Sequence, residues 1–467
     1  MPPPIATLVY LAGIATLFFW VRDPEARVSR ALWIPTIWLM IVASRPVSVW
    51  LQVGPTYDSR DAYIDGSPLD AAVFAAILVA GLIVLALRAK RVLAILRRNG
   101  PILLFFAFCL ISVAWSDYPF VAFKRWIKAV GDLAMVLVIL TEKDSLAATK
   151  RVLTRAGFVL IPISLLFINY YPALGRSYNQ WTWTPMFSGV TMGKNLLGMT
   201  CLICGIGSWW CFLTAYRSPK SKQRSRRMMA YAVITAMATY LILKADSMTS
   251  FSCLVLAGSV LFISSLESSS RNKRRLHLSV AVAVLIAAFA LFMDTGGFLV
   301  KTLGRDTTLT GRTAVWGAVL AQVRHPLVGA GFESFWMGNR LLKIWDAINQ
   351  PGIQEAHNGY LEVYLNLGWM GVLLLAVLMV SGYRNVFSAL SQDRLMGRVM
   401  LAFFVVGAVY NFTEAGFRMM APAWIFFLFA ITSAPEREMA TSKVAAVKMP
   451  PRLARPAIRE PLHERTL

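Results

Sequence analysis

One long polar segment of this 467-residue chain carries the residue types that acid–base and anion-binding chemistry require. Residues 294–355 are mostly polar, interrupt an otherwise apolar sequence, and lead directly into the motif His-Asn-Gly-Tyr-Leu at 357–361. Histidine has an ordinary pKa near neutrality, so His357 is the natural candidate for a general base. In the same segment, Arg312 offers paired N–H donors that suit phosphate. We therefore expect the chemistry to lie in this loop.

Both residues also have a simpler interpretation. An interfacial histidine at position 357 could cap the helix that follows it, and Arg312 could lie in solvent or bind lipid headgroups. The other histidines are weaker candidates: His325 precedes a proline in a turn, and His277 lies on the opposite side of the membrane from the loop.

The rest of the chain has the composition of a membrane protein. Hydrophobic residues make up 57% of it and charged residues 15%, and its mean hydropathy is +0.58, which is far from the composition of soluble domains. A transmembrane helix needs roughly 17 to 25 mostly apolar residues. The segments that approach this length are 5–20, 31–53, 70–87, 101–116, 127–140, 156–170, 196–216, 228–243, 248–266, 278–293, 360–380, 399–410 and 420–431.

These segments predict an all-α polytopic membrane protein with about 12–13 transmembrane helices. Residues 1–293 would form the amino-terminal part of the helix bundle, 294–359 one long extracytoplasmic loop, and 360–434 the carboxy-terminal helices. The remaining residues, 435–467, are basic and proline-rich, and we expect them to be disordered.

The formal charge of +23 lies mainly on alternate connections between the predicted spans. Basic residues gather at 22–30, 88–98, 143–151, 217–227, 271–275 and 384–398, and in the carboxy-terminal tail. By the positive-inside rule these segments are cytoplasmic, which places the long loop and the amino terminus outside. Losing one short span would move the amino terminus inside without moving the loop. The charge is explained by topology and anionic headgroups, so no nucleic-acid partner is expected.

Cysteine and carboxylate spacing gives no sign of a disulfide framework or a metal. All five cysteines fall in apolar spans, and the pair Cys201 and Cys204 is interpreted as core packing. The four histidines are scattered, and no two carboxylates of the outer segments stand at ligand spacing in the sequence. We expect no metal and no cofactor.

Within the long loop, the apolar spacing predicts one amphipathic helix. Val315, Val319 and Val323 recur at helical intervals before a His-Pro pair at 325–326. This helix is expected to lie on the outer membrane face. A turn with two glycines follows at 326–332, and then an aromatic stretch at 335–345.

Taken in order, these pieces resemble the O-antigen ligase and polymerase superfamily. They are Gly311-Arg312 with Trp316 four residues after the arginine, Pro-Leu-x-Gly-x-Gly at 326–331, His-Asn-x-x-Leu at 357–361, and Gly368. Two further patches, at 115–126 and 193–198, are most similar to the exopolysaccharide polymerase branch.

The resemblance implies a GT-C-like membrane fold and a metal-independent glycosyl transfer. The donor would be an undecaprenyl-pyrophosphate-linked oligosaccharide, and the acceptor a hydroxyl of a glycan or of lipid A core. The reaction would take place at the periplasmic face of the bacterial inner membrane, with the carboxyl terminus in the cytoplasm. His357 would be the base, Arg312 would bind pyrophosphate, and a chain-length regulator is a candidate partner.

Other residues are candidates for substrate binding. Lys194 and Arg125 are outer-side cations against the positive-inside trend, which makes them more interesting than their cytoplasmic counterparts. Glu414 and Arg418 stand four residues apart and could form a mutual salt bridge. Alternatively, Glu414 or Glu355 could orient the imidazole of His357.

One position departs from the pattern of the ligases. Ligases of this family carry a second basic residue in a Ser-Arg type motif, whereas the corresponding stretch here, 244–250, has Met248 at that place. Lys244 is the candidate that would replace it. The departure favours polymerase over ligase.

Two alternatives from other classes remain open at this stage. A lipid-linked glycan transporter would also have many spans and intramembrane charges such as Arg45 and Asp70, although no internal repeat is visible. A structural subunit of an export complex would keep its function when His357 and Arg312 are replaced by alanine.

Overall fold

The computed structural model describes residues 1–434 except 24–27, 54–65, 179–182, 267–272 and 296–308. The predicted disorder of residues 435–467 and part of the long loop therefore lie outside the described residues. Residues Met1–Ala434 form one compact unit. Helices dominate its described part, and the sheet found there is a short antiparallel hairpin of β1 (Arg176–Tyr178) and β2 (Pro185–Phe187).

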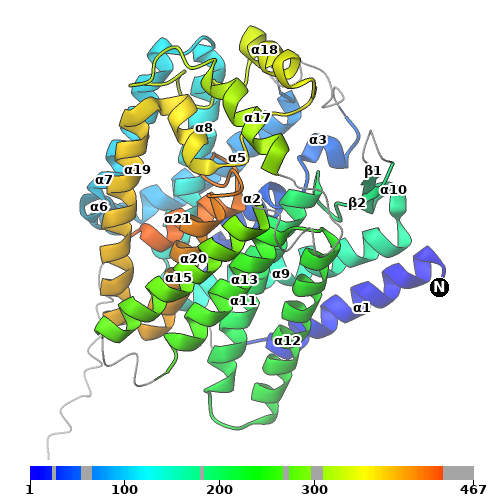
Figure 1. Ribbon diagram of the computed structural model, residues 1–467. Helices are drawn as coiled ribbons and strands as arrows, with labels where there is room; N and C mark the ends of the chain where they lie inside the picture. Colours follow the sequence, from blue (N-terminus) through cyan, green and yellow to red (C-terminus); the bar gives the residue numbers. More distant parts are fainter. Residues whose placement is uncertain (24–27, 54–65, 179–182, 267–272, 296–308, 435–467) are drawn as a thin grey trace, which may run out of the picture. The chain divides into compact units, whose positions relative to one another are not determined.

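Each of the thirteen predicted apolar segments contains a helix. These helices are α1 (Pro3–Val21), α2 (Trp33–Val42), α5 (Pro68–Leu87), α7 (Gly100–Ile111), α8 (Pro119–Leu140), α9 (Ser145–Tyr170), α11 (Lys194–Tyr216), α12 (Lys222–Lys244), α13 (Met248–Ile263), α15 (Lys273–Thr295), α19 (Gly359–Gln392), α20 (Arg394–Tyr410) and α21 (Pro422–Ile431). Other α-helices are α3 (Val47–Trp50), α6 (Ala89–Arg98), α10 (Pro172–Gly175), α17 (Leu309–Leu320) and α18 (Gly338–Ile348). Figure 1 shows their arrangement.

The predicted fold class, an all-α polytopic membrane protein, is confirmed. Within the described residues, α1, α5, α9, α11 and α19 are each long and apolar enough to cross a membrane, and α6 with α7, bent by 89°, adds a sixth crossing if the pair counts as one. The count of 12–13 complete spans stays a prediction. Helices such as α2 and α21 have ten residues each, so they extend only about 15 Å.

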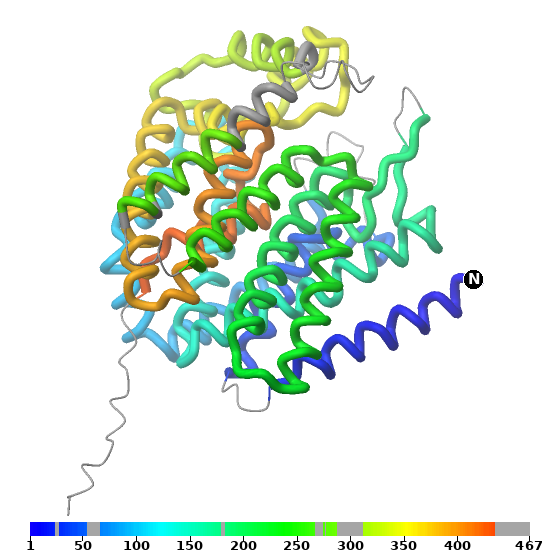
Figure 2. The backbone as a smooth tube through the Cα atoms, turned by 60° about the horizontal axis from the view of Figure 1, so that its bottom comes forward, coloured from blue at the N-terminus to red at the C-terminus, as the bar shows by residue number. Residues whose placement is uncertain are grey.

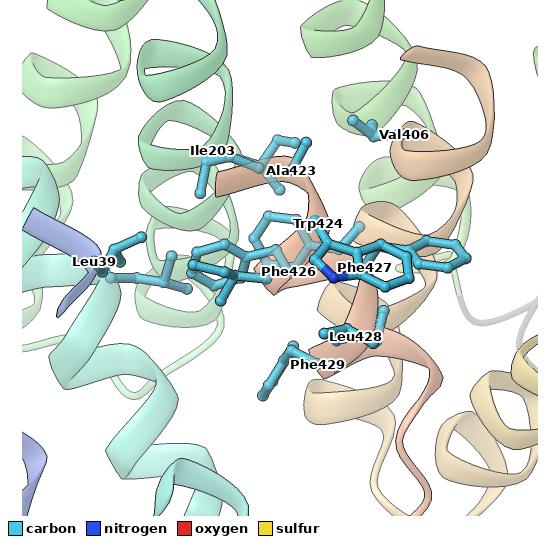
Figure 3. Close-up of a cluster of buried hydrophobic side chains, with 14 of the residues drawn as sticks. Leu39, Ile203, Val406, Ala423, Trp424, Phe426, Phe427, Leu428 and Phe429 are labelled. Atoms are coloured by element: carbon cyan, nitrogen blue, oxygen red, sulfur yellow. The ribbon is translucent and has the colours of Figure 1, made fainter. Parts of the chain in front are cut away.

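Helix α21 forms the centre of the bundle. All ten of its residues are buried, as expected of a helix that is apolar on every side. Figure 3 shows Trp424, Phe426 and Phe427 of this helix among side chains from other elements, including Ile203 of α11 and Val406 of α20. The dense packing provides a firm base for the loop that joins α20 to α21.

Two backbones meet where the glycine turn of the long loop contacts α19. Helix α19 is kinked at Gly368, which has a φ of +63°. A Cβ there would lie 2.3 Å from the carbonyl carbon of Leu327, and one on Gly329 would lie 2.4 Å from that of Asn366. The contact is held by hydrogen bonds from Ala330 N to Leu365 O, Gly331 N to Asn366 O, Trp369 N to Pro326 O and Met370 N to Leu327 O, at 2.9–3.1 Å. The motif glycines are explained by this close approach.

The predicted amphipathic helix exists as α17, and its apolar face packs against other parts of the long loop. Val315 and Val319 are buried in a small core with Phe335, Trp336 and Leu341. Helix α18 packs against α17 in the same core (Figure 1). The valines are therefore buried by neighbouring parts of the loop, and the location of the helix on the outer membrane face stays a prediction.

Candidate active site

Four charged side chains from three separate segments of the chain gather around His357. Its Nδ1 lies 3.1 Å from Glu355 Oε1 and 3.3 Å from Glu414 Oε2. Each carboxylate also contacts a guanidinium: Arg418 Nη1 is 3.0 Å from Glu355 Oε2, and Arg312 Nη2 is 3.6 Å from Glu414 Oε1. The imidazole is thus held by two carboxylates that are each paired with an arginine.

The loops at the ends of α19 and α20 position this group, which we call the His357 cluster. His357 has a φ of +49°, a left-handed conformation that is uncommon outside glycine. The next residue, Asn358, caps α19 by accepting a hydrogen bond from Leu361 N at 2.9 Å. The alternative that His357 caps this helix is therefore wrong, and its side chain is available to the cluster.

Gly359 brings the histidine loop against the loop that carries Glu414. Its N–H donates to the carbonyl oxygens of Asn411 and Glu414, at 2.9 and 3.0 Å. A Cβ at this position would lie only 1.8 Å from Asn411 Oδ1. The His-Asn-Gly motif therefore has glycine at position 359 because any side chain there would clash with Asn411.

The environment raises the pKa of His357 to about 10. Burial alone would lower it, but the hydrogen bonds and the negative charges of Glu355 and Glu414 outweigh burial. For Glu355, burial acts to raise the pKa, yet the bond to His357 and the charge of Arg418 bring it below its ordinary value. The resting cluster is thus an imidazolium between two carboxylates at neutral pH.

A cavity of about 700 Å³ opens beside the His357 cluster. Glu355, Glu414 and Arg418 form part of its wall. Three cations of α8 line it as well, and they are Lys124, Arg125 and Lys128. Farther in, its wall is apolar and includes Trp38, Phe74 and Leu78. The charged part of this wall has four cations, the three of α8 and Arg418, and as many carboxylates. The cavity therefore combines a charged region with an apolar one, as an amphiphilic phosphate ester would require.

Arg125, Lys194 and Lys244 have different positions relative to this cavity. Arg125 lines it and donates a hydrogen bond to the carbonyl oxygen of Glu333. Lys194 is the first residue of α11, and its neighbour Asn195 donates to Glu414 Oε2 at 3.4 Å. Lys244 is exposed, does not line the cavity, and lies over the rings of Phe187 and Tyr240, at 5.3 and 5.8 Å.

Two expectations about charge pairs need correction. Glu414 and Arg418 do not pair with each other, because the loop after α20 turns Arg418 toward Glu355 and leaves Glu414 to Arg312. The sequence showed no carboxylates at ligand spacing, yet ligand atoms of Glu355, His357 and Glu414 lie within 4.8 Å of one another. Folding brings these distant residues together.

This triad has the geometry of a metal site, but its charges oppose a divalent ion. Both carboxylates already contact a guanidinium, and the histidine bears a proton at neutral pH when its pKa is about 10. A metal requires an unprotonated imidazole, and its own charge would be repelled by the arginines. Metal independence stays a prediction.

Sequence reasoning missed Lys128, Glu333 and Asn195. Lys128 stands four residues after Lys124 on α8 and lines the same cavity, so a helical (i, i+4) pattern could have found it. Asn195 lies in the patch at 193–198 that carries part of the family resemblance, which could have pointed to it. Glu333, which accepts a hydrogen bond from Met419 N at 3.2 Å, has no such local signal.

The fold and the cluster define a polytopic helical membrane protein with an acid–base and arginine site between loops at one end of its helices. Comparison with known proteins supports a more specific assignment. Residues 230–376 match a family model described as O-antigen ligase. This range contains both Arg312 and His357 and ends before Glu414.

The chain is also similar to exopolysaccharide production protein ExoQ of Rhizobium meliloti (strain 1021), with 27% identity over 301 residues. The match covers 62% of this chain and 66% of that protein, just under two thirds of its length. Both findings confirm the resemblance to the O-antigen ligase and polymerase superfamily, near its exopolysaccharide branch.

Proposed function

We propose that the protein is a membrane glycosyltransferase that polymerises exopolysaccharide or O-antigen repeat units. It would transfer an undecaprenyl-pyrophosphate-linked oligosaccharide to a hydroxyl of a glycan at the periplasmic face of the inner membrane. The observation that carries this proposal is His357 Nδ1 held between two arginine-paired carboxylates, beside a cavity whose wall is partly charged and partly apolar. The substrate class follows from the family resemblance, and the cluster provides the chemistry.

In the proposed reaction, the acceptor oxygen attacks the anomeric carbon of the donor. The bond from that carbon to the pyrophosphate oxygen breaks, the hydroxyl proton passes to the His357 imidazole, and pyrophosphate leaves attached to its lipid. The leaving group gains negative charge, which Arg312 stabilises by charge-assisted hydrogen bonds. Lys124, Arg125 and Lys128 are suited to hold the anionic donor in the cavity wall.

The protonation state of His357 sets a condition on this mechanism. A base must be unprotonated, and with a pKa of about 10 only roughly one imidazole in a thousand is so at pH 7. The same carboxylates that hold the proton orient the ring and make the neutral imidazole a stronger base. The mechanism therefore requires that turnover rise with pH across the neutral and mildly alkaline range.

A ligase is the second candidate, because the matching family model is described as O-antigen ligase. It would use the same cluster and differ only in its acceptor, lipid A core. Shape and chemistry at the acceptor end of the cavity would decide between the two.

Arg45 and Asp70, the charges that suggested a transporter, both form hydrogen bonds with backbone groups. Arg45 donates hydrogen bonds to the carbonyl oxygens of Thr191 and Gly189, both at 3.1 Å, and Asp70 accepts one from Ser48 N at 2.9 Å. Both charges therefore hold backbone segments in place. Such structural use explains their presence without a translocation path.

The test is a reconstitution of the purified protein with undecaprenyl-pyrophosphate-linked repeat units, with and without lipid A core. A ladder of lengthening lipid-linked chains without lipid A, absent for His357→Ala, supports the polymerase. Single-step transfer that requires lipid A establishes the ligase instead. If wild type and His357→Ala give no new product with either acceptor, while the protein is folded by size-exclusion chromatography, the glycosyltransferase proposal is wrong.

A further inference from the structure

A second large cavity, of about 850 Å³, lies at the other end of the bundle. It is bordered by the carboxyl end of α1, the first turns of α9 and α12, and the last turns of α11. These helices pack against one another, α1 with α9 and α12, and α11 with α9 and α12 (Figures 1 and 2). We call this space the basic cavity.

The basic cavity is distinct from the candidate active site. Asn195, in the first turn of α11, contacts Glu414 of the His357 cluster. The basic cavity is lined by Cys211, Thr214, Ala215 and Ser218 at the other end of the same helix. A rise of 1.5 Å per residue places these ends about 25–30 Å apart.

The described wall of the basic cavity carries a surplus of positive charge. Its cations are Arg22, Lys150, Arg151, Arg155 and Arg227, and its carboxylates are Asp23 and Asp144. Asp23 pairs with Arg227 at 3.4 Å. Asp144 caps α9 by accepting a hydrogen bond from Ala147 N at 3.0 Å. Cations therefore outnumber carboxylates by three in this wall, which attracts an anion.

Two of the arginines have buried donors without partners. Arg155 Nη1 and Arg227 Nε are inaccessible to solvent, and neither has a hydrogen-bond partner among the described residues. A buried donor left without an acceptor is destabilising. The Arg155 guanidinium is fixed in this place because its carbon lies 3.9 Å from the centre of the Trp33 ring. The described wall of the basic cavity therefore has more hydrogen-bond donors than its own acceptors satisfy.

We propose that the basic cavity binds a phosphoryl group. Tetrahedral phosphate offers several charged acceptor oxygens, which match a set of convergent guanidinium groups better than a single carboxylate does. The ligand has two possible sources. Phe18 and Val21 of the largely unburied α1 border the cavity, so an anionic lipid could bind with its chains along this helix. A free phosphate compound could enter from solution.

The experiment measures binding to the full chain in phosphatidylcholine nanodiscs. One arm adds phosphatidylglycerol and counts retained lipid by mass spectrometry, and the other titrates inorganic phosphate by calorimetry. The cavity variant Arg151→Gln/Arg155→Gln is compared with Arg97→Gln/Arg98→Gln, which removes two exposed arginines of α6. We expect the cavity variant to bind at least one of the two probes at least about tenfold more weakly than wild type does, and the control variant to bind both as wild type does.

Each outcome decides the proposal. Selective loss of phosphatidylglycerol in the cavity variant identifies a lipid headgroup, and selective loss of inorganic phosphate identifies a soluble source. If the cavity variant and the control bind both probes equally, the proposal is overturned. Should the cavity variant not fold, Ser218→Glu decides instead, because it leaves every arginine in place and adds a negative charge at an exposed wall position. Unchanged binding by Ser218→Glu would then overturn the proposal.

Discussion

The two ends of the bundle use arginine in opposite ways. In the His357 cluster, Arg312 and Arg418 each contact a carboxylate that also holds the imidazole. In the basic cavity, Arg155 and Arg227 each keep a buried nitrogen atom without a hydrogen-bond partner among the described residues, and cations outnumber carboxylates in the described wall. A paired set of charges tunes the proton affinity of a base, whereas a surplus of cations attracts an anion.

The two sites also differ in how the chain assembles them. The basic cavity collects cations from helix ends, where a membrane protein places lysine and arginine for reasons of topology. The His357 cluster joins residues of three separate segments through a left-handed histidine and a close glycine contact. Backbone strain of this kind persists only where the surrounding structure holds it. Changes at the cluster should therefore have larger effects on catalysis than changes elsewhere.

The largest effect is expected from removing the imidazole. His357→Ala should lower kcat by about a hundred- to ten-thousand-fold, because general base catalysis contributes that much. The measurement is single-turnover transfer from the lipid-linked donor, with protein abundance and size-exclusion profile as controls. Arg97→Gln, an exposed change on α6, should leave turnover unchanged. Full activity of His357→Ala would show that the cluster is structural.

A smaller loss is expected when the loop can no longer dock on α19. Gly368→Ala forces a side chain into a left-handed conformation and within 2.3 Å of the Leu327 backbone, at a cost of about 1–3 kcal/mol or more. Thermal unfolding should move to lower temperature, and turnover should fall because the segment between the glycine turn and His357 shifts. Gly317→Ala, a helical glycine with open space around it, is the matched control. Equal melting temperatures for the two variants would contradict the docking argument.

Removing one carboxylate should change the pH profile more than the maximal rate. With both carboxylates the pKa of His357 is raised to about 10, and the proposed mechanism requires the unprotonated form. Glu414→Gln removes one negative neighbour, so the rise of kcat/KM with pH should move to lower pH by on the order of one unit. Asp117→Asn breaks the Arg340–Asp117 pair of the outer loops and serves as the control. A shift to higher pH would refute the role assigned to Glu414.

The smallest effect is expected at Lys244. Lys244→Gln should leave KM and kcat within about twofold of wild type. The residue is exposed and lies over the rings of Phe187 and Tyr240, and an exposed cation–π contact is worth about 0.5–1 kcal/mol. Arg125→Gln, in the wall of the cavity beside the cluster, should raise KM clearly. A larger change at Lys244 than at Arg125 would reverse this assignment.

The sequence predicted the broad fold and named all five residues of the His357 cluster, but it did not predict how their charges pair. Apolar runs show which segments become helices, because burying apolar side chains in lipid or protein requires little information about neighbours. His357 and Arg312 stood out through the ordered motif, and both lie in the cluster. The valine pattern also predicted α17 correctly, but not what its apolar face would contact.

What the sequence determined by itself was the all-helical membrane class, the position of the long loop, and the residue types able to act as base and anion partner. Local spacing and hydropathy are sufficient for these conclusions. Only the tertiary structure decided that Arg418 pairs with Glu355, that Glu414 pairs with Arg312, and that Lys244 lies outside the cavity. Such pairings depend on how loops far apart in the chain meet, and a charge pair carries no local signal of its distant partner.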